Sequence, residues 1–158
     1  TTSSQDLVSQ LIELSNQIGS DTEYTRSGGG NSSAKTGDTL LIKPSGVPLA
    51  TLDTLVIHLH PLTANAITCN TRGEELCEQI LGDQALWVDY TDPGIPLARL
   101  IDERRRAFTD THHTPPPAIT LLGNHGIIVS GPTKDAILER IDFLTSSIRA
   151  AIDEAETA

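Results

Sequence analysis

Apolar and polar residues follow two different periods along the chain, which predicts a mixture of helices and strands. Apolar residues that recur about every three to four positions indicate amphipathic helices, whereas short apolar runs between turn residues indicate strands. Helical spacing is found at residues 4–19, 62–69, 74–81, 96–108 and from residue 133 onwards. Strand-like runs are found at residues 39–43, 55–60, 85–90, 118–122 and 126–130. Because the two kinds of element are mixed along the whole chain, we expect an α/β or α+β domain in which helices cover a sheet.

The strand-like run at residues 55–60 carries two histidines, His58 and His60. Side chains at positions i and i+2 of a strand point to the same face, so both imidazoles would face one side of the sheet. This spacing alone also fits two hydrogen-bonded polar groups at a strand end. A metal site needs a third ligand, and the best candidate is His125, which lies in the break between two apolar runs.

Three imidazoles with one open coordination position are typical of a catalytic zinc site rather than a structural one. Such an ion acts as a Lewis acid on a carbonyl or enediolate oxygen. Imidazole also suits other divalent metals, so the sequence favours zinc without requiring it. His112 and His113 are weaker candidates, because the stretch before Pro115 predicts an exposed loop. The carboxylates near turns and helix starts are interpreted as caps or solvated charges, and the catalytic acid–base residue is left unassigned.

Residues 27–33, with three consecutive glycines, predict a loop whose backbone can come close to a ligand. The stretch nearly fits the nucleotide-binding P-loop pattern, but Ala34 stands where glycine is required. A hairpin-like turn at residues 36–39 also follows where that motif needs a helix. We therefore reject nucleotide binding of this kind.

A phosphate site is the remaining functional interpretation of this loop. Oriented backbone N–H groups, together with the side chains of Asn31 and Ser32, would suit a phosphate. The turn at Ser45 and Gly46 would supply a second such loop. Two ordinary turns explain the composition equally well, and the sequence alone does not decide between these interpretations.

Two further groups of side chains are interpreted as structural. Trp87 and Tyr90 are expected in the core and at a strand edge. The consecutive arginines 104–106 are expected on a solvated helix face, with a subunit contact as the alternative.

Composition and charge narrow the class of protein and partner. The 158 residues are 37% hydrophobic and 20% charged, which is ordinary for a single globular domain. The formal net charge of -10 argues against nucleic acid as a partner, because phosphate backbones require a basic face. No apolar run reaches the roughly 18–20 residues of a membrane span. The two cysteines lack a disulfide or zinc spacing and favour a reduced, cytoplasmic protein.

Three segments in this order resemble the class II aldolase/adducin family, to which fuculose- and rhamnulose-phosphate aldolases and ribulose-phosphate 4-epimerase belong. The segments are residues 29–33 followed by 41–46, then His58-Leu59-His60-Pro61, then Asn124-His125-Gly126. Residues 87–97 are similar to one bacterial branch with rhamnulose-phosphate aldolase-like segments. The resemblance extends from Leu7 to the last predicted helix.

The resemblance implies one domain over residues 1–158, built as a three-layer αβα sandwich with a central, mainly antiparallel sheet. It implies that His58, His60 and His125 bind the catalytic divalent ion, usually zinc. Part of the pocket for the substrate's phosphate would consist of Asn31, Ser45 and Gly46. Members of the family are usually homo-oligomers, and tetramers are favoured among the aldolases.

The implied reaction is retro-aldol cleavage of a phosphorylated ketose to dihydroxyacetone phosphate and an aldehyde, through a metal-stabilised enediolate. One alternative is a sugar-phosphate epimerase or dehydratase of the same family. The other is a non-catalytic, adducin-like binding module that keeps the fold without the chemistry.

The chain departs from the family just before the histidine pair. Family members carry a segment there with serines for the phosphate and a glutamate that acts as general acid/base. Here residues 49–53 run directly into residues 54–56, and the glutamate has no counterpart. Either the protein has lost this group, or residues are missing near 53–55. We expect the latter, and the absence of methionine from the chain agrees with an incomplete sequence.

Overall fold

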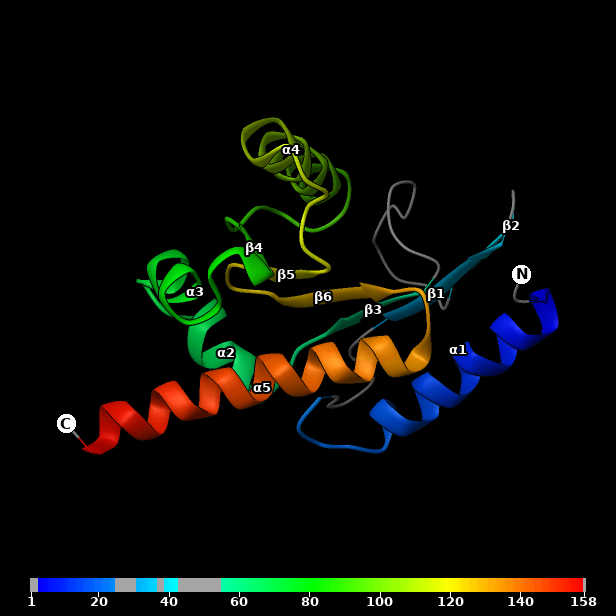
Figure 1. The fold of residues 1–158 in the computed structure, drawn as a ribbon, viewed down its shortest axis with the longest axis horizontal. Coiled ribbons are helices and arrows are strands. Elements are labelled where there is room, and N and C mark those ends of the chain that lie inside the picture. Colours follow the sequence, from blue (N-terminus) through cyan, green and yellow to red (C-terminus); the bar gives the residue numbers. More distant parts are fainter. Residues whose placement is uncertain (1–2, 25–30, 37–38, 43–54, 158) are drawn as a thin grey trace.

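The computed structural model describes residues 3–24, 31–36, 39–42 and 55–157 as a sheet flanked by helices (Figure 1). The helices are α1 (Ser4–Gly19), α2 (Leu62–Thr68), α3 (Gly73–Leu81), the 3-10 helix η1 (Gly82–Gln84), α4 (Ile95–His112) and α5 (Lys134–Thr157). The strands are β1 (Asn31–Thr36), β2 (Thr39–Ile42), β3 (Leu55–Leu59), β4 (Ala85–Val88), β5 (Ile119–Leu122) and β6 (Gly126–Gly131). Most predicted elements are confirmed, and the differences lie at β1, β4 and α4.

The strands form one six-stranded sheet in the order β2-β1-β3-β6-β5-β4. Only β4 and β5 pair in parallel among these strands, so the sheet is mixed and mainly antiparallel, as predicted. The histidine strand β3 lies between β1 and β6, and His58 stands opposite Asn31 on one side and Ile128 on the other. The strand that carries His58 is therefore internal to the sheet rather than at an edge, and His60 lies directly beyond its end.

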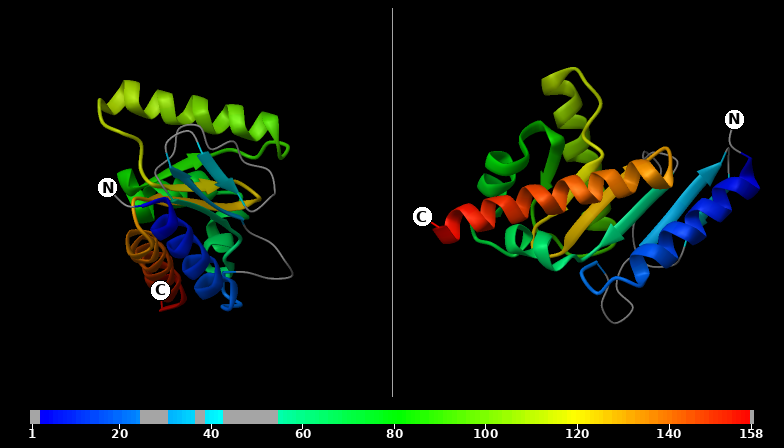
Figure 2. Two further views of the ribbon diagram at one scale, coloured as in Figure 1. Left: turned by 90° about the vertical axis from the view of Figure 1, so that its right-hand side faces the viewer. Right: turned by 60° about the horizontal axis from the view of Figure 1, so that its bottom comes forward.

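Helices cover both faces of the sheet, which confirms the three-layer αβα sandwich (Figure 2). Helix α4 lies on one face, and α1, α2 and α5 lie on the other, with α3 packed beside them near β4. Strand β3 is buried along its whole length. Its residues Leu55, Ile57 and Leu59 join the core under α1 and α5, whereas Val56 joins the core under α4. By this alternation His58 belongs to the α4 face.

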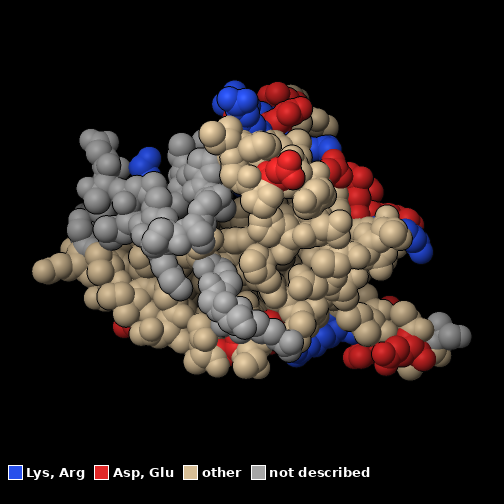
Figure 3. Space-filling model, turned by 180° about the vertical axis from the view of Figure 1, so that it is seen from behind, with Lys and Arg blue, Asp and Glu red and all other residues tan. Residues whose placement is uncertain are grey.

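The long helices bury the apolar residues that recur at helical spacing in the sequence. In α5 the buried positions repeat every three or four residues: Ile137, Ile141, Leu144 and Ile148. In α1 the hydroxyl of Ser3 caps the helix by accepting a hydrogen bond from the backbone N–H of Asp6. The acidic residues at the end of α5 are exposed (Figure 3).

The prediction of a loop through residue 33 is wrong, because strand β1 begins at Asn31. The stretch Asn-Ser-Ser-Ala-Lys-Thr has low strand propensity and no apolar alternation. It becomes a strand because it pairs with β2 on one side and β3 on the other, and tertiary pairing overrides local preference. The predicted hairpin between residues 36 and 39 is confirmed by the pairing of these two residues.

Two element ends also differ from prediction. Strand β4 ends at Val88, and Tyr90 is exposed beyond it. Helix α4 continues to His112, which was expected in a loop, and ends where His113 adopts a left-handed conformation. Ser45, Gly46 and residues 53 and 54 of the expected join at 53–55 lie outside the described residues. None of the described helices is both long and apolar enough to cross a membrane.

Candidate metal centre

His58 is the best-fixed of the three predicted ligands. Its side chain is only 5% exposed, and its Nδ1–H donates a hydrogen bond of 2.8 Å to the backbone carbonyl of Ile127 in β6. A carbonyl can only accept, so the proton of the neutral ring is on Nδ1 and the lone pair is on Nε2. A hydrogen bond from the other ring nitrogen to a carbonyl or carboxylate is the usual support of a metal-binding histidine.

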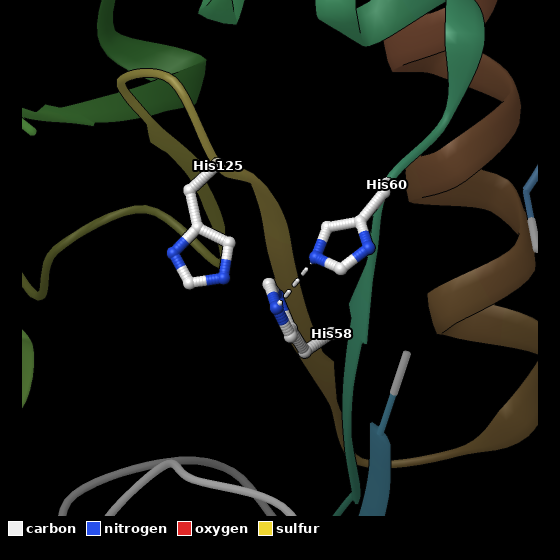
Figure 4. Close-up of side chains that lie close together, drawn as sticks. All are labelled: His58, His60 and His125. Carbon is white, nitrogen blue, oxygen red and sulfur yellow. Dashed lines mark hydrogen bonds between the residues drawn. The ribbon is translucent and has the colours of Figure 1, made fainter. Parts of the chain in front are cut away.

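His60 and His125 bring their rings to the same place from two different elements (Figure 4). His60 directly follows β3, and its Nε2 lies 3.2 Å from Nε2 of His58. The ring centroid of His125 lies 4.9 Å from that of His58 and 5.4 Å from that of His60. One nitrogen from each ring lies within 4.8 Å of the other two, so the structure brings together all three predicted histidines.

His125 lies in the tight turn between β5 and β6. The N–H of His125 donates to the carbonyl of Leu122, which closes a tight turn, and Asn124 adopts a positive φ of 51°. Asparagine tolerates this left-handed conformation better than most residues. At Gly126 a Cβ atom would lie 2.3 Å from the carbonyl oxygen of Leu59 and 2.6 Å from Cδ2 of His60. Glycine therefore lets the start of β6 approach the histidine strand closely.

Burial keeps the three imidazoles neutral. The pKa of His58 falls from 6.5 to about 4, mainly because burial disfavours the charged ring, and the neighbouring His60 and His125 add to the lowering. The hydrogen bond to Ile127 acts in the opposite direction. Burial also lowers the pKa of His60 and of His125, and His60 lowers the latter further. At neutral pH the rings therefore offer lone pairs without first losing a proton.

The donor set fits a divalent metal ion. Two ligands at a tetrahedral zinc, with Zn–N bonds of about 2.0–2.1 Å, lie about 3.3 Å apart. The separation of 3.2 Å between the Nε2 atoms of His58 and His60 is close to this value. Among the described residues, the cluster that could hold a metal consists of these three histidines, without a carboxylate. It therefore has the composition of a catalytic site with an open position.

Two of the residues predicted around the phosphate, Asn31 and Ser32, lie on opposite faces of the sheet. Asn31 is half-buried and stands opposite His58, so the two side chains share a face. Ser32 stands opposite Ile57 and faces α1, where its hydroxyl lies 2.7 Å from that of Ser15. This is a correction to the prediction for Ser32, which the structure places away from the histidines.

Sequence reasoning missed a polar side chain of β1 on the face of the sheet that carries His58. Ser33 is buried and stands opposite Val56, so it lies on the same face as Asn31 and His58. The period of two along a strand would have identified it, once residues 31–36 were known to be a strand. As expected, His112 and His113 are exposed.

A mixed sheet between helical layers, with three histidines converging on one face, defines an α/β sandwich with a candidate metal site. Residues 53–152 match the family model described as "Class II Aldolase and Adducin N-terminal domain". The match covers well over half of the chain, and the protein therefore belongs to the class II aldolase/adducin family.

Solved structures and one curated protein are similar to the chain. The N-terminal class II aldolase domain of a conserved protein from Thermoplasma acidophilum is 18% identical with a TM-score of 0.71, and 96% of each chain is covered. L-fuculose-1-phosphate aldolase from Thermus thermophilus is 15% identical with a TM-score of 0.59, and 96% of each chain is covered. At this level of identity the similarity establishes the fold.

The curated relative is "Uncharacterized oxidoreductase YuxG" from Bacillus subtilis (strain 168), with 28% identity over 85 residues. The matched segment makes up 54% of this chain and 12% of that protein. The chain thus spans a small part of the length of this relative.

Proposed function

We propose that the protein is a metal-dependent, aldolase-like lyase that cleaves a phosphorylated ketose by a retro-aldol reaction. The observation that carries this proposal is the convergence of His58, His60 and His125 as neutral ligands on one face of the sheet. Family membership makes an enzyme of this kind plausible, and the similarity to a fuculose-phosphate aldolase agrees with a sugar phosphate as substrate.

In this proposal His58, His60 and His125 hold the ion, and zinc is preferred. The ion supplies Lewis-acid stabilisation of negative charge on the substrate's oxygens as the carbon–carbon bond breaks. The carbonyl of Ile127 keeps the imidazole of His58 in the tautomer that presents Nε2 to the ion. The amide of Asn31, on the same face, donates or accepts hydrogen bonds with the substrate beside the ion.

The acid–base group is left open in this proposal. Retro-aldol cleavage needs a base that takes the proton of the substrate hydroxyl and returns a proton to the carbanion carbon. Ser45 and Gly46 remain proposed contacts of the phosphate. A homo-oligomer, with a tetramer favoured, is also part of the proposal, and the mass of the native protein in solution tests it.

An assay of metal-loaded protein on a panel of phosphorylated ketoses tests the reaction. Release of dihydroxyacetone phosphate that stops after chelation and returns with Zn²⁺ is the expected result. In the same assay Asn31→Ala should slow turnover, whereas Ser32→Ala, which changes the opposite face, should leave it largely unchanged.

The alternatives give different products in that assay. An epimerase changes the configuration of the sugar phosphate without cleaving it, and a dehydratase releases water and forms a new carbonyl compound. An adducin-like module gives no turnover with any substrate even when metal is bound. Bound metal with cleavage supports the lyase, and bound metal without cleavage rejects it.

A further inference from the structure

The single tryptophan of the chain packs between two glycines that belong to different elements. A Cβ atom added to Gly73, at the start of α3, would lie 2.5 Å from Cη2 of Trp87. A Cβ atom added to Gly123, in the turn before His125, would lie 3.2 Å from Cζ2 of the same ring. The six-membered ring of the indole therefore fills the space that both glycines leave open.

Backbone hydrogen bonds fasten the same turn on two sides. The N–H of Gly123 donates a hydrogen bond of 2.8 Å to the carbonyl of Val88 at the end of β4. The N–H of Asn124 donates one of 2.7 Å to the carbonyl of Thr68 at the end of α2. The turn thus rests on β4 and α2, and the indole of Trp87 fills the space between the turn and α3.

The indole is itself held in place. Its Nε1–H donates a hydrogen bond of 3.0 Å to Oδ1 of Asp89, and the other carboxylate oxygen of Asp89 pairs with the guanidinium of Arg104. Arg104 lies on α4, so this pair connects the helix on one face of the sheet to the ring beside the turn. Each arginine of the predicted solvated face has a partner: Arg104 pairs with Asp89, Arg105 donates a hydrogen bond to the carbonyl of Pro117, and Arg106 pairs with Asp102.

We propose that Trp87 is a positioning residue for the third metal ligand, His125. The indole sets the position of the turn that carries His125, while Asp89 and Arg104 set the orientation of the indole. This inference rests on the proposed metal site. The rings of His58 and His60 are placed by β3 and by the carbonyl of Ile127 in β6, so loss of the indole acts mainly on His125.

The consequence is a selective loss of metal affinity. Without the indole the turn keeps its backbone hydrogen bonds but loses the packing that fixes its distance from α3. Outer-shell partners of metal ligands typically contribute about 10–100-fold to affinity. We expect Trp87→Leu to weaken metal binding by about tenfold or more, and Trp87→Phe, which keeps a smaller ring, to have an intermediate effect.

Co²⁺ titration, followed by visible absorption, tests the proposal on the whole chain, because these bands report the geometry of the ligands. The variants are Trp87→Leu, Trp87→Phe and His125→Ala, and circular dichroism measures how much of each is folded. Leu14→Ala is the matched control, because it truncates a fully buried side chain of α1, a helix at the other end of the sheet from the turn (Figure 1). It should lose stability while keeping the wild-type affinity and spectrum.

The possible results distinguish a failure of the positioning role of Trp87 from a failure of the proposed metal site. If the wild type binds Co²⁺ and folded Trp87→Leu binds more weakly with altered bands, Trp87 positions His125. If His125→Ala loses the wild-type spectrum but folded Trp87→Leu keeps affinity and bands, the positioning role is refuted and the metal site stands. If Trp87→Leu does not fold, Trp87→Phe and Gly123→Ala, which crowds the ring from the other side, decide by the same criteria. A wild type that binds no Co²⁺ rejects the proposed metal site.

Discussion

The stability of the metal-free protein should fall steeply below neutral pH, because of His58. In the folded chain burial lowers the pKa of His58 from 6.5 to about 4. Between these two values the unfolded chain binds a proton at this residue and the folded chain does not. Protonation therefore favours unfolding, so the contribution of His58 is fully present above about pH 6.5 and is lost as the pH falls towards 4.

The size of the effect follows from the same shift. Each unit of pKa difference corresponds to about 1.4 kcal/mol, so by about pH 4 the loss reaches about 3 kcal/mol of the free energy of unfolding. A marginally stable domain has about 5–15 kcal/mol in total. The lowered pKa values of His60 and His125 act in the same direction.

Urea unfolding of metal-free protein at a series of pH values measures this loss, with His58→Gln as the comparison. Glutamine can still donate to the carbonyl of Ile127 but does not titrate. Because all other groups titrate in both proteins, the difference between their free energies of unfolding isolates His58. The wild type should lose about 3 kcal/mol relative to the variant between about pH 7.5 and about pH 4. Two curves that stay parallel over this interval would refute the reasoning.

Three further predictions concern the surroundings of the site. Gly126→Ala should cost about 1–3 kcal/mol of stability in urea unfolding and weaken metal binding, because the new Cβ would lie 2.3 Å from a carbonyl oxygen of β3. Gly19→Ala is the control: a Cβ there meets nothing within 4 Å, so neither the free energy of unfolding nor metal binding should change. Glu23 accepts hydrogen bonds from the backbone N–H and hydroxyl of Thr63 at the start of α2, so Glu23→Ala should cost about 1 kcal/mol and shift the thermal midpoint downwards. Peptide mapping by mass spectrometry of protein from the natural source should reveal additional residues, including a glutamate, at 53–55. A peptide that runs continuously through these positions would show that the acid–base glutamate has been lost.

The common orientation of His58 and His60 could be predicted from the sequence, because it depends only on the period of two residues in a strand. His58 and His60 share a face in any sheet, whatever packs around them. The face itself could not be predicted, since it depends on which helices cover each side. The convergence of His125 depends on the pairing of β3 with β6, which joins residues far apart in the chain.

Ser32 shows why the phosphate loop was predicted less well. A stretch of small polar residues after three glycines indicates a loop by its composition, and no local signal reveals that it is a strand. Pairing with β2 and β3 makes this stretch a strand. The register with β3 then places Asn31 on the same face as His58 and Ser32 on the opposite face. Register is a tertiary property, so a prediction from residues in sequence order could not separate these neighbours.

X-ray absorption spectroscopy of the zinc-loaded chain tests the metal centre most directly. The predicted result is one zinc ion per chain, with three imidazole nitrogens at about 2.0–2.1 Å in its first coordination shell. His125→Ala should reduce the imidazole count by one. A chain that retains no zinc, or a zinc shell in which His125→Ala changes nothing, would contradict the assignment of His58, His60 and His125 as the ligands.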